Sequence, residues 1–307
     1  MGTADAVPGS VKGILASLGI APSKRRGQTF LIRREVAERI AGLASLTPDD
    51  AVLEIGPGLG ALTGALLAAA GRVVAVESDR RLAAWLRDRF RDCRTFELIH
   101  ADALTCDIPG LLKGMAARGR RVKVVSNIPY SISGPLIARL LGASDDWSCM
   151  VLTVQRELAR RITAPPGGKE YGAFTVLCRC RAETGEAFTI APGAFYPRPG
   201  VDSSVVVFRS RPSPLIPAAE EAAFFSLVRL LFSQRRKSIG TVLKRALKGH
   251  PAAETLRGAF ASAGIDPAVR PERLGVEEFR LLGEALGRVE WKADWGRATI
   301  SDCPREC

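Results

Sequence analysis

A run of glycines interrupts the 307-residue sequence at Glu54-Ile-Gly56-Pro-Gly58-Leu-Gly60. It stands between a β-rich run, Ala51–Ile55, and a helical pattern that begins at Ala61. Glycine lets the backbone turn tightly and pass close to a ligand, and the amides that open a helix favour a negative group such as a carboxylate. Such a loop also occurs as a plain turn between strand and helix, so the motif by itself leaves both interpretations open.

Acidic residues end the next two β-rich runs. Glu77 closes the run Arg72–Glu77, and Asp102 closes the run Phe96–Asp102. Ligands of open α/β sheets bind at the carboxyl ends of the strands, where a carboxylate such as Glu77 accepts hydrogen bonds from ribose hydroxyls. Asp102 is suited to accept one from an adenine amino group. Each acid alone is best interpreted as a helix cap or a solvated loop residue. Together with the glycine loop they favour a bound adenosine moiety.

The fourth β-rich run ends in Ser126-Asn127-Ile128-Pro129-Tyr130. The lone pair of an aromatic amine is delocalised into the ring, which makes the nitrogen a poor nucleophile. Hydrogen bonds to the amide oxygen of Asn127 and the carbonyl of Ile128 would pull that nitrogen towards a tetrahedral shape. Pro129 stiffens the turn, and Tyr130 can stack on a base. The order resembles the (Asn/Asp/Ser)-Pro-Pro-(Tyr/Phe) signature of amino-methyltransferases; the alternative is a β-turn with a buried tyrosine.

The spacing of the glycines narrows the choice of cofactor. Glu-x-Gly-x-Gly-x-Gly is not the Gly-x-Gly-x-x-Gly of dinucleotide-binding proteins, because Ala61 occupies the last position. The spacing resembles class I methyltransferases, which bind S-adenosylmethionine. A second aromatic residue, Phe195, begins the segment Phe195–Ser203 and can cover the other face of a flipped base. From its residue type alone, Phe195 is a core residue.

The elements that must position these residues alternate between β-rich runs and helical patterns, which predicts a parallel sheet covered on both faces. The β-rich runs are Ala51–Ile55, Arg72–Glu77, Phe96–Asp102, Val122–Asn127 and Met150–Val154. Two later runs, Phe174–Arg181 and Val201–Arg209, have no long helix between them and are predicted to form an antiparallel hairpin at the sheet edge. The expected fold class is α/β, a Rossmann-like methyltransferase sheet with a small C-terminal helical domain.

A proline-rich stretch, Arg211–Pro217, marks a change in composition, after which the patterns are helical. We therefore expect a leader and short helix over 1–22, a methyltransferase domain over 23–210, a helical domain over 218–289 and a tail over 290–307. In the helical part, an apolar stripe is expected to face the core; it consists of Ile239, Val242, Leu243, Ala246 and Leu247.

The formal net charge of +12 favours a polyanionic partner. No acidic residue occurs between Glu221 and Glu254, whereas a solvated face normally mixes both signs. A one-sided cluster therefore favours contact with RNA phosphates. The candidate RNA-binding residues are Arg235, Arg236, Lys237, Lys244, Arg245 and Lys248. The basic turn Lys24–Arg26 is the reserve candidate.

Composition excludes several classes. A hydrophobic fraction of 47% and a charged fraction of 25% are ordinary for a soluble globular protein, and no apolar run is long enough to cross a membrane. The N-terminus lacks the pattern of a secretory signal. The seven cysteines form no Cys-x-x-Cys pair and there are two histidines, which argues against a metal site and for reduced thiols. We expect a cytoplasmic monomer that binds no metal and no membrane.

The motifs together resemble the KsgA family of small-subunit ribosomal RNA adenine dimethyltransferases. The resemblance runs from about Val11 to Leu286 and includes Gly27–Leu31, the proline-rich segment after Phe195 and Phe232–Ser238. It implies transfer of methyl groups from S-adenosylmethionine to the N6 amines of two adjacent adenosines near the 3′ end of small-subunit RNA, within a pre-ribosomal particle. The implied catalytic residues are Asn127, Pro129, Tyr130 and Phe195. The cofactor residues are Gln28, Thr29, Leu31, Glu54, Gly56, Gly58, Gly60, Glu77, Asp102 and Asn127.

The sequence departs from that family in having Thr29 where its pattern Gly-Gln-Asn-Phe-Leu has Asn, and Ser131 in place of a common Asn. The nearest alternative is the Erm family, which modifies large-subunit RNA and shares the glycine loop and Asn-Ile-Pro-Tyr. The segment Phe232–Ser238 favours KsgA. A binding protein without activity, like relatives of mitochondrial transcription factor B, is the alternative from another class, and the intact Asn127–Tyr130 motif argues against it. A nicotinamide oxidoreductase is the weakest alternative.

Overall fold

The computed structural model describes residues 10–22, 27–117, 119–217, 219–287 and 289. The chain folds into two compact units. The first contains residues up to 159 together with 184–210, and the second contains 160–183 and the described residues from 211 onward. The leader over 1–9, the basic turn Lys24–Arg26 and the tail over 290–307 lie outside the described residues.

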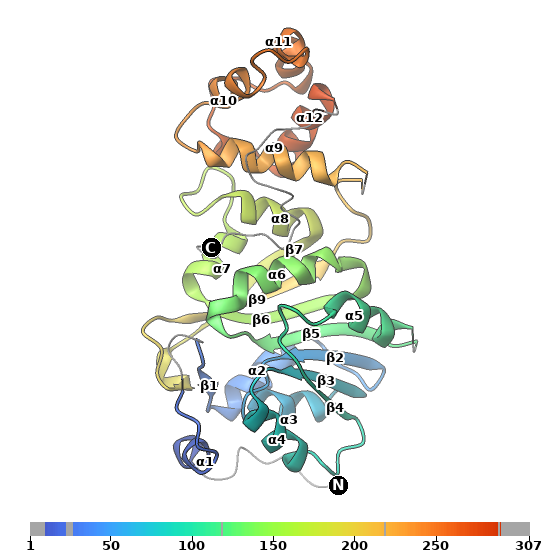
Figure 1. The fold of residues 1–307 in the computed structure, drawn as a ribbon, viewed down its shortest axis with the longest axis vertical. Coiled ribbons are helices and arrows are strands. Elements are labelled where there is room, and N and C mark those ends of the chain that lie inside the picture. The colour runs from blue at the N-terminus through green and yellow to red at the C-terminus, as the bar shows by residue number, and fades with distance from the viewer. Residues whose placement is uncertain (1–9, 23–26, 118, 218, 288, 290–307) are drawn as a thin grey trace. The chain divides into compact units, whose positions relative to one another are not determined.

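A seven-stranded sheet forms the centre of the first unit, with strand order β4-β3-β2-β5-β6-β9-β7 (Figure 1). Strands β2 to β6 are parallel, and β9 runs antiparallel to β6. The strands are β2 (Asp50–Ile55), β3 (Arg72–Glu77), β4 (Phe96–His100), β5 (Arg121–Asn127), β6 (Cys149–Gln155), β7 (Ala182–Ile190) and β9 (Ser203–Ser210). The five predicted β-rich runs and the α/β fold class are confirmed.

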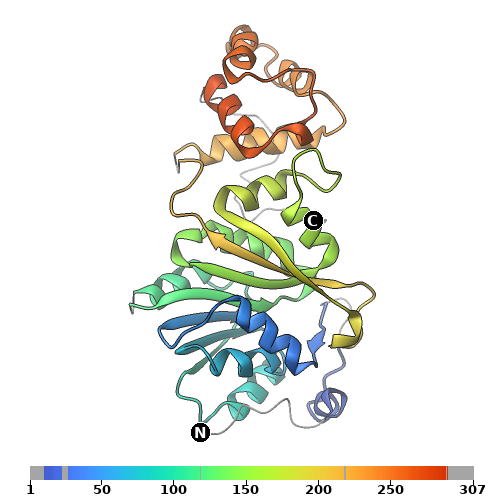
Figure 2. The same ribbon diagram turned by 180° about the vertical axis from the view of Figure 1, so that it is seen from behind.

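Helices cover both faces of this sheet. Figure 1 shows α5 and α6 in front of the strands, and Figure 2, seen from behind, shows α2 on the opposite side. The helices are α2 (Arg34–Leu43), α3 (Ala61–Leu67), α4 (Arg80–Arg89), α5 (Ile108–Ala116), α6 (Ser133–Gly142) and α7 (Arg156–Thr163). Because both faces are covered, every residue of β2 is buried, whereas the edge strand β4 is only partly so.

A second, two-stranded sheet joins two segments that are far apart in the sequence. Strand β1 (Phe30–Leu31) pairs antiparallel with β8 (Phe195–Tyr196), so that Leu31 lies opposite Phe195. The helix α1 (Val11–Ser17) begins at Ser10, whose hydroxyl accepts a hydrogen bond from the amide of Gly13. Its apolar side packs on a cluster that includes Phe30.

The second unit is helical. It contains α8 (Ala173–Arg181), α9 (Glu221–Ser233), α10 (Ile239–Ala246), α11 (Ala252–Ala263) and α12 (Val276–Leu286). Within it, the ring of Tyr171 lies 6.0 Å from that of Phe232, and Arg181 forms an ion pair of 2.5 Å with Glu221. No helix among the described residues is long and apolar enough to cross a membrane.

The expected strand over Phe174–Arg181 was wrong, because these residues form α8. The segment is buried on nearly all sides, from Phe174 to Cys178 and again at Cys180. An apolar run buried all round has no distinctive period, so a buried helix cannot be distinguished from a buried strand by pattern. A bond from the amide of Gly172 to Oγ1 of Thr175 starts the helix, and β7 follows it. The expected hairpin between this segment and Val201–Arg209 is therefore wrong as well. Val201–Arg209 contains the strand β9, which lies between β6 and β7, so that β7 is the edge strand.

Helix α10 presents the predicted apolar stripe with one exception. Ile239, Val242, Leu243 and Leu247 are buried, but Ala246 is exposed. A methyl group contributes too little apolar area to fix which way a short helix faces. Lys244, Arg245 and Lys248 are exposed, as expected for residues off the stripe.

Candidate active site

The glycine loop follows β2 and leads into α3. Gly56, Gly58 and Gly60 have φ values of 69°, 60° and 83°, a backbone region that side chains disfavour. A Cβ on Gly56 would lie 3.1 Å from Cδ of Pro129, and one on Gly58 would lie 3.0 Å from Cδ1 of Phe30. Glycine is therefore needed twice, for the turn and for the close approach of the Pro129 and Phe30 side chains.

Glu77, at the end of β3, holds this loop. Its Oε2 accepts a hydrogen bond from the amide of Gly58 at 3.2 Å, and its Oε1 accepts one from the amide of Asp79 at 2.9 Å. Burial raises the pKa of Glu77 above its ordinary value, although these backbone donors partly offset the effect. Each carboxylate oxygen can accept more than one hydrogen bond, so the side chain retains capacity for ribose hydroxyls.

Glu54 lies inside the fold at the other side of the loop. Its side chain accepts a hydrogen bond from Oγ1 of Thr63 at 2.7 Å, and the residue is 1% exposed. Burial raises the pKa of Glu54 to about 8, and the nearby charge of Glu77 adds to the shift. The carboxyl group is therefore mostly protonated at neutral pH.

Asp102 takes a different position from the two buried acids. It is exposed, and its Oδ1 accepts a hydrogen bond from the amide of Leu104 at 2.9 Å. This is the turn-capping bond expected of a loop acid. The second carboxylate oxygen has no partner among the described residues and stays available to a ligand.

Asn127 ends β5 with one satisfied and one unsatisfied group. Its Nδ2 donates a hydrogen bond to the carbonyl of Thr29 at 3.4 Å, while its Oδ1 is buried and has no partner among the described residues. A buried polar atom left unpaired costs roughly 1–3 kcal/mol, so the arrangement calls for an explanation. The oxygen is positioned as a free acceptor. Thr29 makes this contact through its backbone, which does not require the asparagine of the family pattern.

The loop after Asn127 is fixed from three directions. The amide of Ile128 donates to the carbonyl of Thr153 at 3.3 Å, and Oγ of Ser133 donates to the carbonyl of Pro129 at 3.2 Å. The hydroxyl of Tyr130 lies 2.5 Å from Oγ of Ser203, which is fully buried in β9. Within the described part of the chain, the carbonyl of Ile128 has no hydrogen-bond partner and remains a second acceptor.

A pocket that is open to solvent lies between the glycine loop, β1 and the end of β5. Its lining brings together six of the predicted cofactor residues: Thr29, Leu31, Glu54, Gly56, Gly58 and Asn127. Gln28, Gly60, Glu77 and Asp102 do not line it. The lining also includes residues that sequence reasoning missed: Phe30, Pro57, Leu59, Ala61 and Leu62. Their apolar types carry no chemical signal, and only their position between predicted residues could have indicated them.

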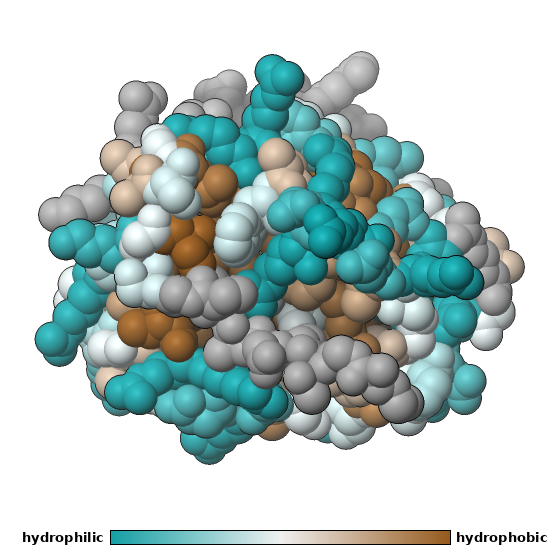
Figure 3. Space-filling view, turned by 90° about the horizontal axis from the view of Figure 1, so that it is seen from below, coloured by the Kyte–Doolittle hydropathy of each residue, from teal (hydrophilic) through white to brown (hydrophobic). Residues whose placement is uncertain are grey.

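Phe195 lies in the hydrophobic core rather than at the surface. It is 3% exposed and belongs to a cluster that includes Leu31 and Val205. This packing supports its interpretation as a core residue, and stacking on a base would require the ring to become accessible. Figure 3 shows the molecule from below, relative to Figure 1. On this face, apolar residues form patches between hydrophilic side chains.

The basic cluster of the second unit is heterogeneous. Arg235 makes internal contacts: its guanidinium donates to the carbonyls of Gly168 and Lys169 at 3.2 and 2.6 Å and lies 3.6 Å from Glu272. Arg236 and Lys237 are exposed, as are the three basic residues of α10 and its C-terminal end. Among the described residues, none of these five pairs with an acidic side chain. The reserve candidate, Lys24–Arg26, falls outside the described residues.

Metal and disulfide chemistry receive no support from the described residues. They contain no group of three or more His, Cys, Asp or Glu side chains that could hold a metal ion. Five cysteines fall within them, and all five are free. Burial raises the pKa of the Cys149, Cys178 and Cys180 thiols, which makes these side chains unreactive.

The sheet order, the glycine loop and the acids at the strand ends define a Rossmann-like methyltransferase. A family model described as "Ribosomal RNA adenine dimethylase" matches residues 22–279. The chain belongs to the ribosomal RNA adenine dimethylase family, as the resemblance predicted. Methyltransferases of this kind use S-adenosylmethionine.

Several relatives are similar over nearly their whole length. Proteins named "Ribosomal RNA small subunit methyltransferase A" from Moorella thermoacetica and Geobacter metallireducens are 39% and 40% identical to this chain over 285 and 268 residues. These alignments cover 92% and 87% of this chain and 98% and 96% of the relatives. The crystal structure of the 23S rRNA methyltransferase ErmE is 30% identical, with a TM-score of 0.66, and covers 84% of this chain and 99% of its own.

Proposed function

We propose that this protein transfers methyl groups from S-adenosylmethionine to the N6 amines of two adjacent adenosines near the 3′ end of small-subunit ribosomal RNA. Family membership supports the reaction, and the higher identity to small-subunit methyltransferases than to ErmE supports the small-subunit substrate. The observation that carries the proposal is the unpaired, buried Oδ1 of Asn127 at the edge of the glycine-loop pocket.

The residues in and beside the pocket offer a donor set that suits the cofactor. The glycine loop leaves room for backbone amides to approach a ligand, and Glu77 stands beside it with capacity for ribose hydroxyls. Asp102, exposed at the end of the neighbouring strand, is suited to an adenine amino group. Bound there, S-adenosylmethionine supplies a methyl group that is already activated, so alignment contributes most of the remaining rate enhancement.

Asn127 and Ile128 act on the amine. The unpaired Oδ1 of Asn127, which lines the pocket, and the backbone carbonyl of Ile128 accept its hydrogens, which draws the lone pair out of the ring and directs it at the pocket. Tyr130 stacks on the base, and its hydroxyl is tied to Ser203, which fixes the plane of the ring. Pro129 packs against Gly56 and sets the height of this loop above the pocket. These groups position the amine, and no strong general base is required.

We propose that the second unit binds RNA through its exposed basic residues. We also propose that the substrate is RNA within a pre-ribosomal particle. We also propose that the protein acts as a cytoplasmic monomer. The net charge of +12 supports binding to a polyanion. Arg235 contributes differently, because its contacts with Gly168 and Lys169 organise the unit that presents the other basic side chains.

The test is methyl transfer from radiolabelled S-adenosylmethionine to purified small-subunit particles, large-subunit particles and free RNA. Mass spectrometry of digested RNA then identifies the product. We expect N6,N6-dimethyladenosine in small-subunit RNA. Product confined to large-subunit RNA would favour the Erm-type alternative. Binding of particles without any methyl transfer would favour a non-catalytic relative.

The RNA grip is tested by salt dependence. Each phosphate contact contributes about one unit to the slope of log affinity against log salt concentration. Replacing Arg236 and Lys237 by alanine should flatten that slope by up to about two units, with Arg235 left intact to preserve the unit. The matched control replaces two exposed basic residues of the first unit, Arg87 and Lys113. If both pairs leave the slope unchanged, the grip lies elsewhere.

A further inference from the structure

The buried carboxyl group of Glu54 lines the cofactor pocket and faces no cation that the structure describes. Among the described residues it accepts one hydrogen bond, from the neutral hydroxyl of Thr63. No described lysine or arginine lines the pocket. An unpaired buried carboxylate is costly in free energy, and a group in this position normally keeps its proton instead.

The elements packed around Glu54 offer no compensating charge. Helix α3 carries no ionisable side chain, and the described segment 27–31 carries none either. Strand β3 contributes Glu77, a second carboxylate whose charge opposes ionisation of Glu54. On β5 the cation Lys123 lies towards the other end, where it binds Asp50. Within the described part of the chain, the pocket therefore holds one carboxyl group and no cation that would favour its ionised form.

The following inference rests on the proposed function. S-adenosylmethionine carries a sulfonium, an ammonium and a carboxylate, so its net charge is positive. After methyl transfer the sulfur is neutral, and S-adenosylhomocysteine has no net charge. A cation in the pocket favours the ionised form of Glu54, whereas a neutral sulfur does not. We propose that Glu54 is the residue by which the site prefers its charged methyl donor to its uncharged product, releasing its proton to solvent when the donor binds and regaining it when the product remains.

This exchange makes donor affinity depend on pH. Below a pH of about 8, free Glu54 holds its proton, so binding of the donor must release it. Full release of one proton makes affinity rise about ten-fold per pH unit, by linkage. S-adenosylhomocysteine should show a smaller rise. A third probe, 5′-methylthioadenosine, lacks the amino-acid charges and should show none.

The experiment is titration calorimetry of the full chain with these three ligands between pH 5.0 and 6.5, a range that lies below the titration of the ligand amino group near about 7.7–8. Buffers of different ionisation enthalpy count the protons exchanged. We expect about one proton released with S-adenosylmethionine and a donor-to-product affinity ratio that rises with pH. Glu54→Gln, which mimics the protonated acid, should abolish both effects and leave methylthioadenosine binding intact. Glu38→Gln, an exposed carboxyl elsewhere, is the matched control.

Two outcomes would overturn the proposal. One is a wild-type affinity ratio that does not change with pH, and the other is a Glu54→Gln variant that still releases a proton on binding the donor. The proton count of the wild type does not depend on the folding of any variant. Failure of all three ligands to bind the wild type would instead overturn the proposed function, and this inference with it.

Discussion

Strand β2 carries a buried carboxyl group at each end, and the two behave in opposite ways. Asp50 begins the strand and Glu54 is its last residue but one. Burial raises the pKa of both, but at Asp50 hydrogen bonds from Lys123 and Thr47 outweigh it, so its pKa lies below the ordinary value. At Glu54 the single hydrogen bond from Thr63 does not outweigh the effect of burial, and the pKa rises to about 8.

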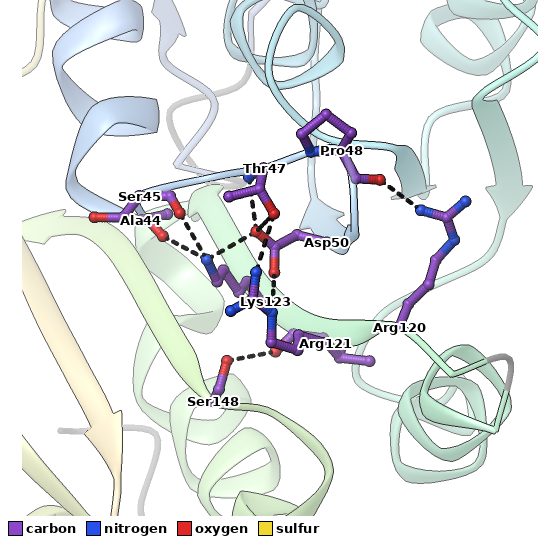
Figure 4. Close-up of polar contacts among 10 residues, drawn as sticks. Ala44, Ser45, Thr47, Pro48, Asp50, Arg120, Arg121, Lys123 and Ser148 are labelled. Atoms are coloured by element: carbon purple, nitrogen blue, oxygen red, sulfur yellow. Dashed lines mark hydrogen bonds and ion pairs between the residues drawn. The ribbon is translucent and has the colours of Figure 1, made fainter.

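At the amino end of the sheet, Asp50 is surrounded by cations and hydrogen-bond donors; its Oδ2 accepts hydrogen bonds, and its Oδ1 forms an ion pair with Arg121 at 3.3 Å (Figure 4). Nζ of Lys123 donates to Oδ2 of Asp50 at 3.0 Å and to the carbonyls of Ala44 and Ser45, just after α2, at 2.8 and 2.9 Å. The amide and hydroxyl of Thr47 also donate to Asp50, at 2.7 and 3.0 Å. One lysine thus uses three donors to connect β5, β2 and the end of α2.

The carboxyl end leaves its polar groups unpaired. Oδ1 of Asn127 has no described partner, and Glu54 has no cation. Fully satisfied buried groups stabilise a fold, whereas unsatisfied ones reduce stability and are retained where a ligand completes them. The comparison therefore separates an end that contributes stability from an end that contributes chemistry, and substitutions at the two ends should have different effects.

The largest expected effect is on stability, at Lys123. Lys123→Met removes the buried one of the two cations that pair with Asp50 and leaves the buried carboxylate with the more exposed Arg121, which should lower the free energy of unfolding by up to about 3–5 kcal/mol. Urea denaturation of the full chain measures it. Adding Asp50→Asn should restore part of the loss, because the buried carboxylate that has lost its lysine disappears. Arg120→Met, which removes a more exposed bond to the carbonyl of Pro48, is the control and should cost less than about 1 kcal/mol. A Lys123→Met loss as small as the control would contradict the comparison.

The next effect is on turnover, at Asn127. Asn127→Ala should reduce methyl transfer by about 10²–10³-fold, the scale of losing one aligned hydrogen-bonding group in an active site. RNA affinity, measured by filter binding on the same substrate, should stay nearly unchanged. Stability should change little, because the substitution removes an unsatisfied buried oxygen along with the one long hydrogen bond from Nδ2 to Thr29. Wild-type turnover in this variant would remove Asn127 from the mechanism.

A smaller effect is expected on cofactor affinity, at Glu77. Loss of charge-assisted hydrogen bonds of about 1.5–3 kcal/mol each should weaken S-adenosylmethionine binding ten-fold or more in Glu77→Ala. Part of this loss would come from the glycine loop, since Glu77 also holds the amide of Gly58. Glu77→Gln keeps one acceptor oxygen and should fall between the wild type and Glu77→Ala. If calorimetry gave the wild type and Glu77→Ala equal affinities for S-adenosylmethionine, Glu77 would not be a cofactor-binding residue.

The carboxyl end was largely predictable from the sequence, and the amino end was not. Glycines and acids that follow apolar runs are visible as patterns, because parallel strands bring their carboxyl ends together. The acceptor at Asn127 was predicted from its motif. By contrast, Lys123 sits inside an apolar strand, and its partner Asp50 is 73 residues away. No local pattern indicates which buried lysine will find a carboxylate so far along the chain.

The remaining differences have the same origin. Arg235 was predicted with Arg236 and Lys237 from a run of charge, yet it bonds to carbonyls 66 and 67 residues earlier. Phe195 was interpreted from its type as a core residue, and the structure places it in the core beside Leu31; its stacking on a base, which the family resemblance implies, stays a prediction. Charge and aromaticity are properties of a residue type, whereas burial depends on long-range packing, which the sequence does not display.

The smallest expected effect is the pH dependence of the unfolding free energy in the free protein. Its sign should differ between Glu54 and Asp50, the carboxyl groups at the two ends of β2. Glu54 is favoured in its protonated form, so its stabilisation is complete below about pH 4.3 and is lost as the pH rises towards 8. Asp50 is favoured in its ionised form, so its stabilisation is present above about pH 3.9 and is lost as the pH falls through its lowered pKa. Between pH 6 and 7, Glu54 should therefore reduce the unfolding free energy by about 1 kcal/mol. Urea denaturation of the wild type and of Glu54→Gln at pH 6 and 7 measures this change in unfolding free energy. Asp50→Asn should leave the change between pH 6 and 7 intact and alter the unfolding free energy only at acidic pH. Parallel wild-type and Glu54→Gln profiles would mean that Glu54 is ionised in the free protein, and the contrast between the two ends of β2 would fail at its carboxyl end.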